Sequence, residues 1–548
     1  MAGRRPALAA EALRRWAFAS PLYRYTLVGR QPEKLAATPT DPWSGDAARG
    51  VRLIDGVWSF AGQTFAGQEG VPWFPQDARP DWIAAMHGFA WLRDLREAGQ
   101  AARATARGAV HGWIEQCGRW HPLTWRADVI GARIAAWLAN ANFLLVNADP
   151  PFRRRVLASL AEQARHLARV AQRGPDGAAR LRAVKGMVYA ALCLPGNERR
   201  LGAALAMLDA ELRRQVLPDG GHVERNPSTL LAVFRDAVEL RGLLHGAGRE
   251  VPQGLLGAID RMAPMLRFFR HGDGALALFH GGAEEAAPAI DGALALAQAG
   301  GKPAAHAEAS GFVRLAARRT TILVDAGRPP APPFAARAHA GTAAFEMSVG
   351  ADRMVVNCGA YQGADANWEL ALRATAAHST VTVDDTNSAE LLPRGGLGRG
   401  PGHVRVERAE QDGEQGLVVE HDGYQSRLQL AHRRTLWLSA DGQRLRGEDR
   451  LIGPGGERFA VRFHLHPGVP AASVEDGSVA LLRLPSGTGW RLSATGGVVA
   501  VTDSVYLGRP GEMRRGQQVV VSGGLNGEET VIAWELAAIP AKAERRRS

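Results

Sequence analysis

The periodicity of apolar residues changes near residue 300, and this change restricts the folds open to the chain. Before it, apolar residues recur with the helical period in alanine- and leucine-rich segments that end at Gly, Pro or Asn. Helices joined by such short links favour an antiparallel all-α array, of which an α/α toroid is one form. The predicted helices cover residues 83–98, 101–116, 127–145, 151–172, 181–194, 199–216, 228–246 and 252–269.

After about residue 305, short runs of alternating apolar and polar residues follow one another and are separated by turns such as Asp441-Gly and Asn526-Gly. No long helical pattern intervenes. Strands without crossover helices form antiparallel sheets, so this half is predicted to be a β-sandwich. The predicted strands cover residues 312–315, 321–325, 344–349, 353–357, 380–383, 403–406, 417–420, 433–438, 459–466 and 517–522.

These patterns predict two domains, which agrees with a length of 548 residues, too long for a single core. The first is an α/α toroid-like helical domain at residues 1–300. Within it, residues 51–65 are predicted to form a small β-hairpin that turns at Asp55-Gly56. The second is an antiparallel β-sandwich at residues 305–540, after a linker at residues 300–305.

The chain is basic, with a formal charge of 66 − 55 = +11, and nearly all of its basic residues are arginines. Arginine grips carboxylates through two parallel hydrogen bonds, and a positive field favours an anionic partner. An arginine-rich codon bias would produce the same composition. We expect an acidic polysaccharide or oligosaccharide, and no nucleic acid, because the chain has no recognition motif, zinc finger or lysine-rich tail.

The first residues contain Arg4 and Arg5, a pair that suggests a secretion signal. Glu11, Arg14 and Arg15 interrupt the apolar stretch that should follow, so the segment is predicted to be an amphipathic helix instead. The chain has no apolar run of roughly 18 residues, so we expect no transmembrane helix. These observations favour the cytoplasm as the location of the protein.

Tryptophan is concentrated early in the chain, where ten of the fourteen lie before residue 140. Indole rings either stack on sugar faces or anchor helix packing. Trp73 and Trp125, beside Pro72 and Pro122, are the predicted surface rings. The three cysteines are far apart and are expected to be buried thiols.

A polar loop precedes the helix predicted at residues 228–246 and contains His222, Glu224, Arg225 and Asn226. The backbone N–H groups of a helix N-terminus favour an anion, so this loop could grip a carboxylate. The alternative is an ordinary helix entry, with Asn226 as the cap and proline in the first turn. The sequence leaves both interpretations open.

His378 stands directly ahead of the strand at residues 380–383, and Tyr361 lies in a glycine-bracketed turn upstream. An imidazole and a phenol can both move protons near neutral pH when their surroundings tune them. This strand–loop–strand unit is a candidate catalytic site.

His464 and His466 are two residues apart on a predicted strand, so their side chains should share one face. Together with Asp384 they could bind a structural divalent metal, the one cofactor that we consider. The alternative is a hydrogen-bonded histidine pair inside the sandwich.

Several of these motifs together resemble the heparinase II/III-like family, and they occur in order from about residue 200 to 470. They are Asp219–Asn226, Arg337-Ala-His-Ala-Gly-Thr, Ala376-Ala-His-Ser-Thr-Val, His421-Asp-Gly-Tyr, His432-Arg-Arg-Thr-Leu-Trp-Leu and Arg462-Phe-His-Leu-His-Pro.

The resemblance implies an α/α toroid joined to an antiparallel sandwich, and a polysaccharide lyase that cleaves uronate-containing glycans by β-elimination. That reaction needs a group that neutralises the carboxylate, a base for the C5 proton and an acid for the O4 leaving group. The implied catalytic residues are His378, Tyr361 and His222. The implied substrate-binding residues are Glu224, Arg225, Asn226, Arg182 and His339. The resemblance also implies the cell envelope or periplasm as the location.

The chain departs from the family pattern at three positions. Thr229 stands where the family's catalytic tyrosine is expected, and a His-Ala-Asp sequence is His339-Ala-Gly here. An Asn–His pair expected in the preceding helix is missing, so Arg180, Arg182 or Lys185 would have to hold the carboxylate. A degenerate protein that binds an anionic glycan without cleaving it is therefore the alternative function.

Overall fold

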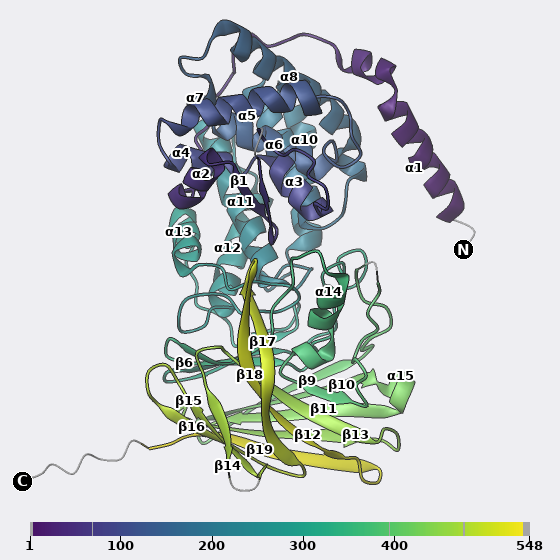
Figure 1. Ribbon diagram of the computed structural model, residues 1–548, viewed down its shortest axis with the longest axis vertical. Coiled ribbons are helices and arrows are strands. Elements are labelled where there is room, and N and C mark those ends of the chain that lie inside the picture. The colour runs from purple at the N-terminus through teal and green to yellow at the C-terminus, as the bar shows by residue number, and fades with distance from the viewer. Residues whose placement is uncertain (1–3, 68–69, 394, 475–476, 541–548) are drawn as a thin grey trace, which may run out of the picture. The chain divides into compact units, whose positions relative to one another are not determined.

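The structure is a computed structural model that describes residues 4–67, 70–393, 395–474 and 477–540. Helices dominate the first half and strands the second, with the change near residue 300 (Figure 1). The chain forms two compact units, which do not follow this change in secondary structure. The first contains residues 1–214 and 235–258, and the second contains residues 215–234 and 259–548.

The predicted helices are present, and two of them are divided. Residues 83–98 form two helices because Phe89 adopts a left-handed conformation, with φ at 60°. Residues 127–145 divide at Asn140. The helices are α1 (Arg4–Ala19), η1 (Pro21–Leu27), α2 (Ala47–Ile54), α3 (Pro80–Gly88), α4 (Leu92–Glu97), α5 (Ala102–Cys117), α6 (Ala127–Ala139), α7 (Ala141–Leu145), α8 (Pro150–Val170), η2 (Ala171–Arg173), α9 (Ala178–Cys193), η3 (Glu198–Arg200), α10 (Leu201–Gln215), α11 (Pro227–Gly246), α12 (Gln253–Phe268), α13 (Ala287–Ala297), α14 (Ala366–Arg373), η4 (Thr375–Ala377) and α15 (Gln425–Leu428).

The predicted hairpin is present, but its turn was placed wrongly. Strands β1 (Val57–Phe60) and β2 (Gln63–Ala66) pair in antiparallel fashion around Ala61 and Gly62. The Asp55-Gly56 pair ends α2 instead, and residues 51–54 belong to that helix. Apolar residues four apart suit a helix turn as well as a strand, and the short run does not distinguish the two.

Tryptophan rings form the core of the first unit. Trp113 and Trp137 pack edge to face with their centroids 5.6 Å apart, and both are almost fully buried. The prediction that Trp73 and Trp125 lie on the surface is wrong, because they are 4% and 3% exposed. A neighbouring proline indicated a loop but did not show which way the ring points. Within the same unit, Gly186 of α9 lies against Gly131 of α6, and a Cβ there would meet the Gly131 Cα at 2.3 Å.

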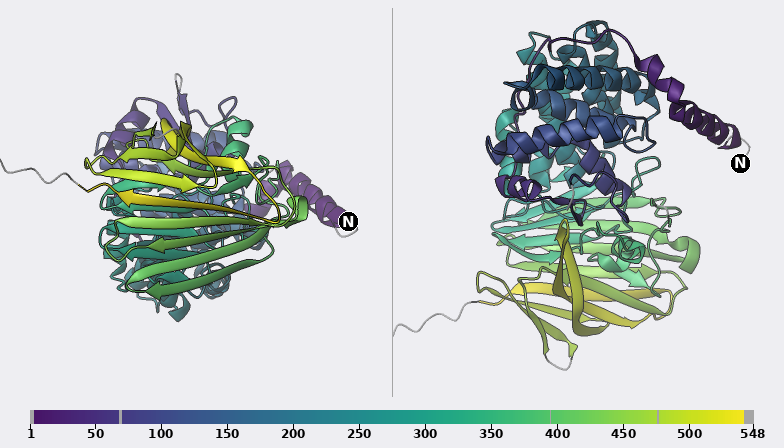
Figure 2. Two further views of the ribbon diagram at one scale, coloured as in Figure 1. Left: turned by 90° about the horizontal axis from the view of Figure 1, so that it is seen from below. Right: turned by 45° about the horizontal axis from the view of Figure 1, so that its top comes forward.

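The second unit contains two antiparallel sheets, as predicted for the sandwich. The eight-stranded sheet has the order β14-β15-β16-β19-β12-β11-β10-β9. The other has the order β17-β18-β13-β7-β6-β5-β4-β3, with β8 paired to β13. Long neighbouring strands of the first sheet are visible side by side in the left view of Figure 2. The alternating burial along β11 and β12 shows one face of this sheet turned to the core.

Each predicted run overlaps a strand, but several strands are longer than their runs, and β3, β12, β14, β15, β16, β17 and β19 were not predicted. The strands are β3 (His306–Ala307), β4 (Phe312–Ala317), β5 (Thr320–Asp325), β6 (Phe345–Val349), β7 (Asp352–Val356), β8 (Val381–Val383), β9 (Val404–Gln411), β10 (Glu414–Tyr424), β11 (Leu430–Leu438), β12 (Arg444–Ile452), β13 (Arg458–Leu465), β14 (Ala471–Val474), β15 (Val479–Arg483), β16 (Gly489–Thr495), β17 (Val498–Arg509), β18 (Glu512–Gly524) and β19 (Glu529–Ala538).

A carboxylate lies buried at the centre of the sandwich. Asp449 of β12 accepts hydrogen bonds from Arg434 at 2.7 and 3.1 Å, from His432 at 2.8 Å and from the Trp534 indole at 2.9 Å. Burial alone would raise the pKa of Asp449, but the charge of Arg434 and the bond from His432 hold it far below its usual range. Arg434 also donates to the carbonyls of Ala343 and Ser379.

The three cysteines are buried and unpaired, as predicted. Within the described residues, no helix has the length and apolar character required to cross a membrane.

Removing the Asp449 carboxylate should destabilise the fold strongly. Asp449→Ala leaves a buried guanidinium and an indole N–H without their partner, which costs about 3–5 kcal/mol. Urea unfolding of the variant and the wild type measures the difference. Glu529→Ala is the matched control, because its ion pair with Arg450 is exposed and is expected to contribute under about 1 kcal/mol. Similar losses in both variants would contradict a central role for Asp449.

Candidate functional site

The loop before α11 is held entirely within the second unit. Asn226 accepts a hydrogen bond from the Thr229 backbone N–H at 3.0 Å and donates to the His280 carbonyl at 2.9 Å. This is the helix cap that the sequence offered as an alternative. His222 is 2% exposed, accepts from the Glu224 N–H at 3.2 Å and contacts Gln215 at 3.1 Å. The polar atoms of His222 and Asn226 therefore form hydrogen bonds within the fold.

Arg225, predicted to bind substrate, is also fully engaged. Its backbone is left-handed, with φ at 54°, and its side chain is 6% exposed. The guanidinium donates to the carbonyls of Ser310, Gly311 and Arg328 at 2.6–2.8 Å. It also pairs with the Asp325 carboxylate at 2.5 Å. The arrangement joins the loop to β5 and leaves the guanidinium no donor for a glycan carboxylate.

Asp325 and His280 lie beside the loop and the histidine pair, and the sequence did not single them out. His280 Nε2 lies 3.0 Å from Asp325 Oδ2, and its Nδ1 accepts the backbone N–H of His339 at 3.3 Å. The pKa of Asp325 is lowered: burial opposes ionisation, but Arg225 and His280 outweigh it. The Phe279-His-Gly-Gly turn that holds His280 was a signal in the sequence, since glycines often bring backbone close to a buried group.

The structure brings His339 and His378 together, 39 residues apart in sequence. His339 Nδ1 lies 3.1 Å from His378 Nε2, and the rings meet edge to face. His378 Nδ1 is 2.8 Å from the Ala374 carbonyl, so that nitrogen carries the proton. His378 Nε2 is then the acceptor, and His339 Nδ1 donates to it. Among the described residues, His339 Nε2 has no hydrogen-bond partner, and its lone pair is unoccupied.

Neighbouring groups hold this histidine pair in place. Gly341 lies flat against the His378 ring, and a Cβ there would come within 2.8 Å of its Cδ2. The glycine at the departure from the family's His-Ala-Asp pattern therefore makes room for the ring. Arg434 donates to the Ser379 carbonyl at 2.8 Å, which fixes the next residue. Burial lowers the pKa of His378 to about 4 and that of His339 well below its usual value, so both rings are neutral at pH 7.

Tyr361 does not join this pair in the described structure. Its ring stacks on Trp368 with the centroids 6.3 Å apart, and its hydroxyl approaches the Asp365 N–H at 3.5 Å.

Glu224, predicted to bind substrate, contacts Thr229, whose hydroxyl donates to it at 3.3 Å. Thr229, at the position where the resemblance predicted a phenol, is thus bonded within the loop.

The three predicted metal ligands, His464, His466 and Asp384, each contact different groups of the fold. His464 lies 2.8 Å from the Ser504 hydroxyl and 2.9 Å from the Ala376 carbonyl. Asp384 accepts the backbone N–H groups of residues 457 and 458. His466 lies beyond the end of β13, 4.0 Å from Glu284. In the part of the chain that the structure describes, no three His, Cys, Asp or Glu side chains gather in a metal-binding arrangement.

The predicted clamp residues of α9 lie in the first unit. Arg182 is half-buried there. Lys185 is buried and pairs with Asp236 at 2.7 Å and Glu239 at 2.8 Å. Arg180 donates to the carbonyls of Gln172 and Gly174. Lys185 is therefore committed to the helical core.

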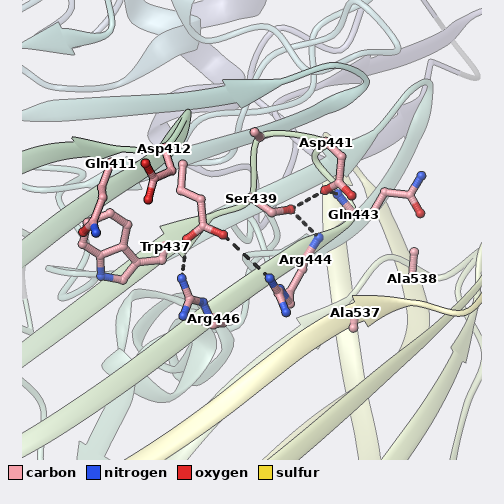
Figure 3. A pocket seen from close by; sticks show the side chains of 12 residues that line it. Gln411, Asp412, Trp437, Ser439, Asp441, Gln443, Arg444, Arg446, Ala537 and Ala538 are labelled. Carbon is pink, nitrogen blue, oxygen red and sulfur yellow. Dashed lines mark hydrogen bonds and ion pairs between the residues drawn. The ribbon is translucent and has the colours of Figure 1, made fainter.

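A large concavity lies on the eight-stranded sheet. It encloses about 940 Å³ and includes Trp437, Ser439 and Asp441 (Figure 3). Its arginines, Arg444 and Arg446, are both paired with Glu414. None of the predicted catalytic, substrate-binding or metal-binding residues lines it, so the histidine pair remains the candidate site.

The fold is that of the heparinase-type polysaccharide lyases. A crystal structure of heparinase III superposes with a TM-score of 0.72 at 13% identity, covering 88% of this chain and 81% of that one. A mutant of the heparan sulfate lyase of Pedobacter heparinus gives a TM-score of 0.62 at 16% identity, over 95% and 88% of the two chains. At these identities the likeness shows the fold alone.

The family follows from the sequence matches. The profile described as "Heparinase II/III N-terminus" matches residues 57–286, and "Heparinase II/III-like, C-terminal" matches residues 299–535. The chain belongs to the heparinase II/III-like family, as its motifs indicated. It is also 31% identical over 543 residues to FtsZ-localized protein C of Caulobacter vibrioides, covering 95% of this chain and 93% of that protein.

Because several histidines are buried and neutral, the free energy of unfolding should decrease as the pH is lowered. Burial lowers the pKa of His222 and His464 to about 3 and that of His378 to about 4. The unfolded chain takes up these protons at about pH 6.5, so stability is complete above that pH and decreases as the pH falls toward 4. Each histidine should contribute a slope of about 1.4 kcal/mol per pH unit, measured by urea unfolding.

His464→Gln should make this decrease shallower. The exposed residue His403 provides the control, and His403→Gln should leave the slope unchanged. An unchanged slope in His464→Gln would show that this histidine does not titrate on unfolding.

Proposed function

We propose that this chain acts on uronate-containing acidic glycans by β-elimination, with His339 as the proton-transfer group. The observation that supports it is the histidine pair, which leaves His339 Nε2 as a neutral lone pair held by hydrogen bonds. His378 is the positioning residue, because its bond to the Ala374 carbonyl sets the tautomer of both rings. An anionic substrate beside His339 would raise the pKa of that imidazole and favour its taking the C5 proton.

This proposal revises the roles suggested by the resemblance. His378 was expected to be the base or acid, with Tyr361 as its partner and the loop at residues 222–226 as the carboxylate clamp. Both ring nitrogens of His378 form hydrogen bonds within the fold. The Arg225 guanidinium is occupied by its ion pair with Asp325 and its hydrogen bonds to backbone carbonyls. A single imidazole would then take the proton from C5 and return one to the O4 leaving group.

The test measures the absorbance of the unsaturated uronate product over a panel of acidic glycans. His339→Ala should lower turnover by at least about a hundredfold, the usual contribution of an acid–base group. His403→Ala, at an exposed histidine, should keep it. Full turnover in His339→Ala would exclude this residue as the base.

A binding function without cleavage is the alternative, and Thr229 favours it. The threonine stands at the place of the family's phenol and hydrogen-bonds Glu224, so that position offers no group that moves protons near neutral pH. Glycan binding without product, in the wild type as in His339→Ala, would establish this alternative in place of the lyase proposal.

A second candidate function is association with FtsZ. The relative from Caulobacter vibrioides is named for its localisation to FtsZ, and it matches nearly the whole of this chain. The two functions are compatible, because one concerns a glycan and the other a protein partner.

Purified chain should then sediment with FtsZ polymers formed with GTP and stay in the supernatant with unpolymerised FtsZ. His339→Ala, which removes the candidate base, should sediment equally well. Absence of the chain from the polymer pellet at low and physiological salt would contradict direct association.

A further inference from the structure

The concavity on the eight-stranded sheet lies on the face that is turned away from the core. Along β11, Trp437 alternates with the buried residues Leu436 and Leu438, so its side chain projects outward. The concavity of about 940 Å³ that it lines adjoins a second one of about 540 Å³, because both include Trp437 and Arg446. The two concavities together form the sheet groove.

Trp437 is the large aromatic ring of the first concavity. Ten of the fourteen tryptophans are buried, whereas Trp437 is partly exposed. Its cross-strand neighbours are Gly416 on β10 and Arg446 on β12. The six-membered ring of the indole lies over Gly416, where a Cβ would come within 2.7 Å of it. The glycine therefore lets the indole lie along the sheet as part of the groove wall.

Polar side chains with free hydrogen-bonding groups surround this ring. Gln411, Asp412 and Gln443 are exposed, and within the described residues their side chains form no hydrogen bond. Figure 3 shows Gln411 and Asp412 on the side of Trp437, and Gln443 on the opposite side of the concavity. Amide and carboxylate groups are planar and offer at least two polar sites each. They suit a ligand that carries neighbouring hydroxyl groups.

The charges of the sheet groove oppose an anionic ligand. Arg444 and Arg446 both pair with Glu414. The first concavity is lined by two arginines and three carboxylates, a balance of 2 − 3 = −1. The second adds Glu448 and Glu535. A negative field repels uronates, sulfates and phosphates. The groove therefore fits an uncharged ligand better than the acidic glycan proposed for the histidine pair.

We propose that the sheet groove binds an uncharged oligosaccharide. A sugar ring has C–H groups on its faces and hydroxyls at its edge, so one ring would stack on Trp437. Gln411, Asp412 and Gln443 would hydrogen-bond the hydroxyls beside it. The groove extends from β9 to β16 over six neighbouring strands. Five strand spacings are roughly 24 Å, which leaves room for several sugar units. The proposal goes beyond glycan cleavage, because the histidine pair does not line the groove.

The test is isothermal titration calorimetry of the full chain with uncharged hexasaccharides: cellohexaose, maltohexaose, mannohexaose, xylohexaose and hexa-N-acetylchitohexaose. At least one should bind with a Kd of about 1 mM or lower. A heparosan hexasaccharide, of the same length but anionic, should bind at least about tenfold more weakly than that sugar. The variant His339→Ala should bind the uncharged sugar as the wild type does, so a failed lyase assay leaves this measurement unaffected.

The variants separate stacking from a structural role. Trp437→Ala should weaken binding at least about tenfold, because burial of a large apolar side chain contributes more than that factor. Trp437→Tyr should restore most of the affinity. Trp368→Ala is the matched control, since it removes another partly exposed indole of the second unit, outside the groove, and should keep the affinity. Gln443→Ala should weaken binding about threefold or more with an unchanged melting temperature, because this side chain has no bond to lose within the described residues.

Three outcomes would overturn the proposal. The first is that no uncharged hexasaccharide binds the wild type. The second is equal affinity in Trp437→Ala, or an equal loss in Trp437→Ala and Trp368→Ala. The third is binding of the heparosan hexasaccharide with the same affinity as the uncharged sugars. Binding of a lysine-rich peptide in the absence of any sugar binding would assign the groove to a basic protein segment instead.

Discussion

The buried ion pair of Asp449 with Arg434 is the interaction on which the sandwich depends. A carboxylate at this depth persists only when its charge is paired and its lone pairs are occupied, and Arg434, His432 and Trp534 satisfy both conditions. The same guanidinium holds the Ser379 carbonyl, one residue beyond His378. The position of the candidate site is therefore set by the charge at the centre of the sandwich.

A second buried pair, Arg225 with Asp325, gives the loop before α11 a structural role. A guanidinium that contacts three carbonyls and a carboxylate cannot turn to a ligand without leaving Asp325 as an unpaired buried charge. Asp325 in turn binds His280, which accepts the N–H of His339. The loop that resembled a substrate clamp thus supports the histidine pair indirectly, and the proposed proton transfer is assigned to His339.

The fold is shared with the family, and two positions in this chain bear on the proposed chemistry. Gly341 lies against the His378 ring and leaves room for it, while the Thr229 hydroxyl donates to Glu224. A threonine hydroxyl does not move protons near neutral pH, so the proposed proton transfer rests on the histidine pair.

The sequence by itself determined the helical and sheet-rich halves and the family, and it offered Asn226 as a helix cap. Each depends on residues close together in the chain, where periodicity and turn chemistry act directly. It could not place the hairpin turn at Ala61, because a short apolar run suits a helix or a strand equally well. Only the tertiary structure decided which polar groups remain available. Arg225 meets Asp325 across 100 residues and His339 meets His378 across 39, and such partners are chosen by packing. Burial then removed Arg225 from chemistry and left one nitrogen of His339 able to take part.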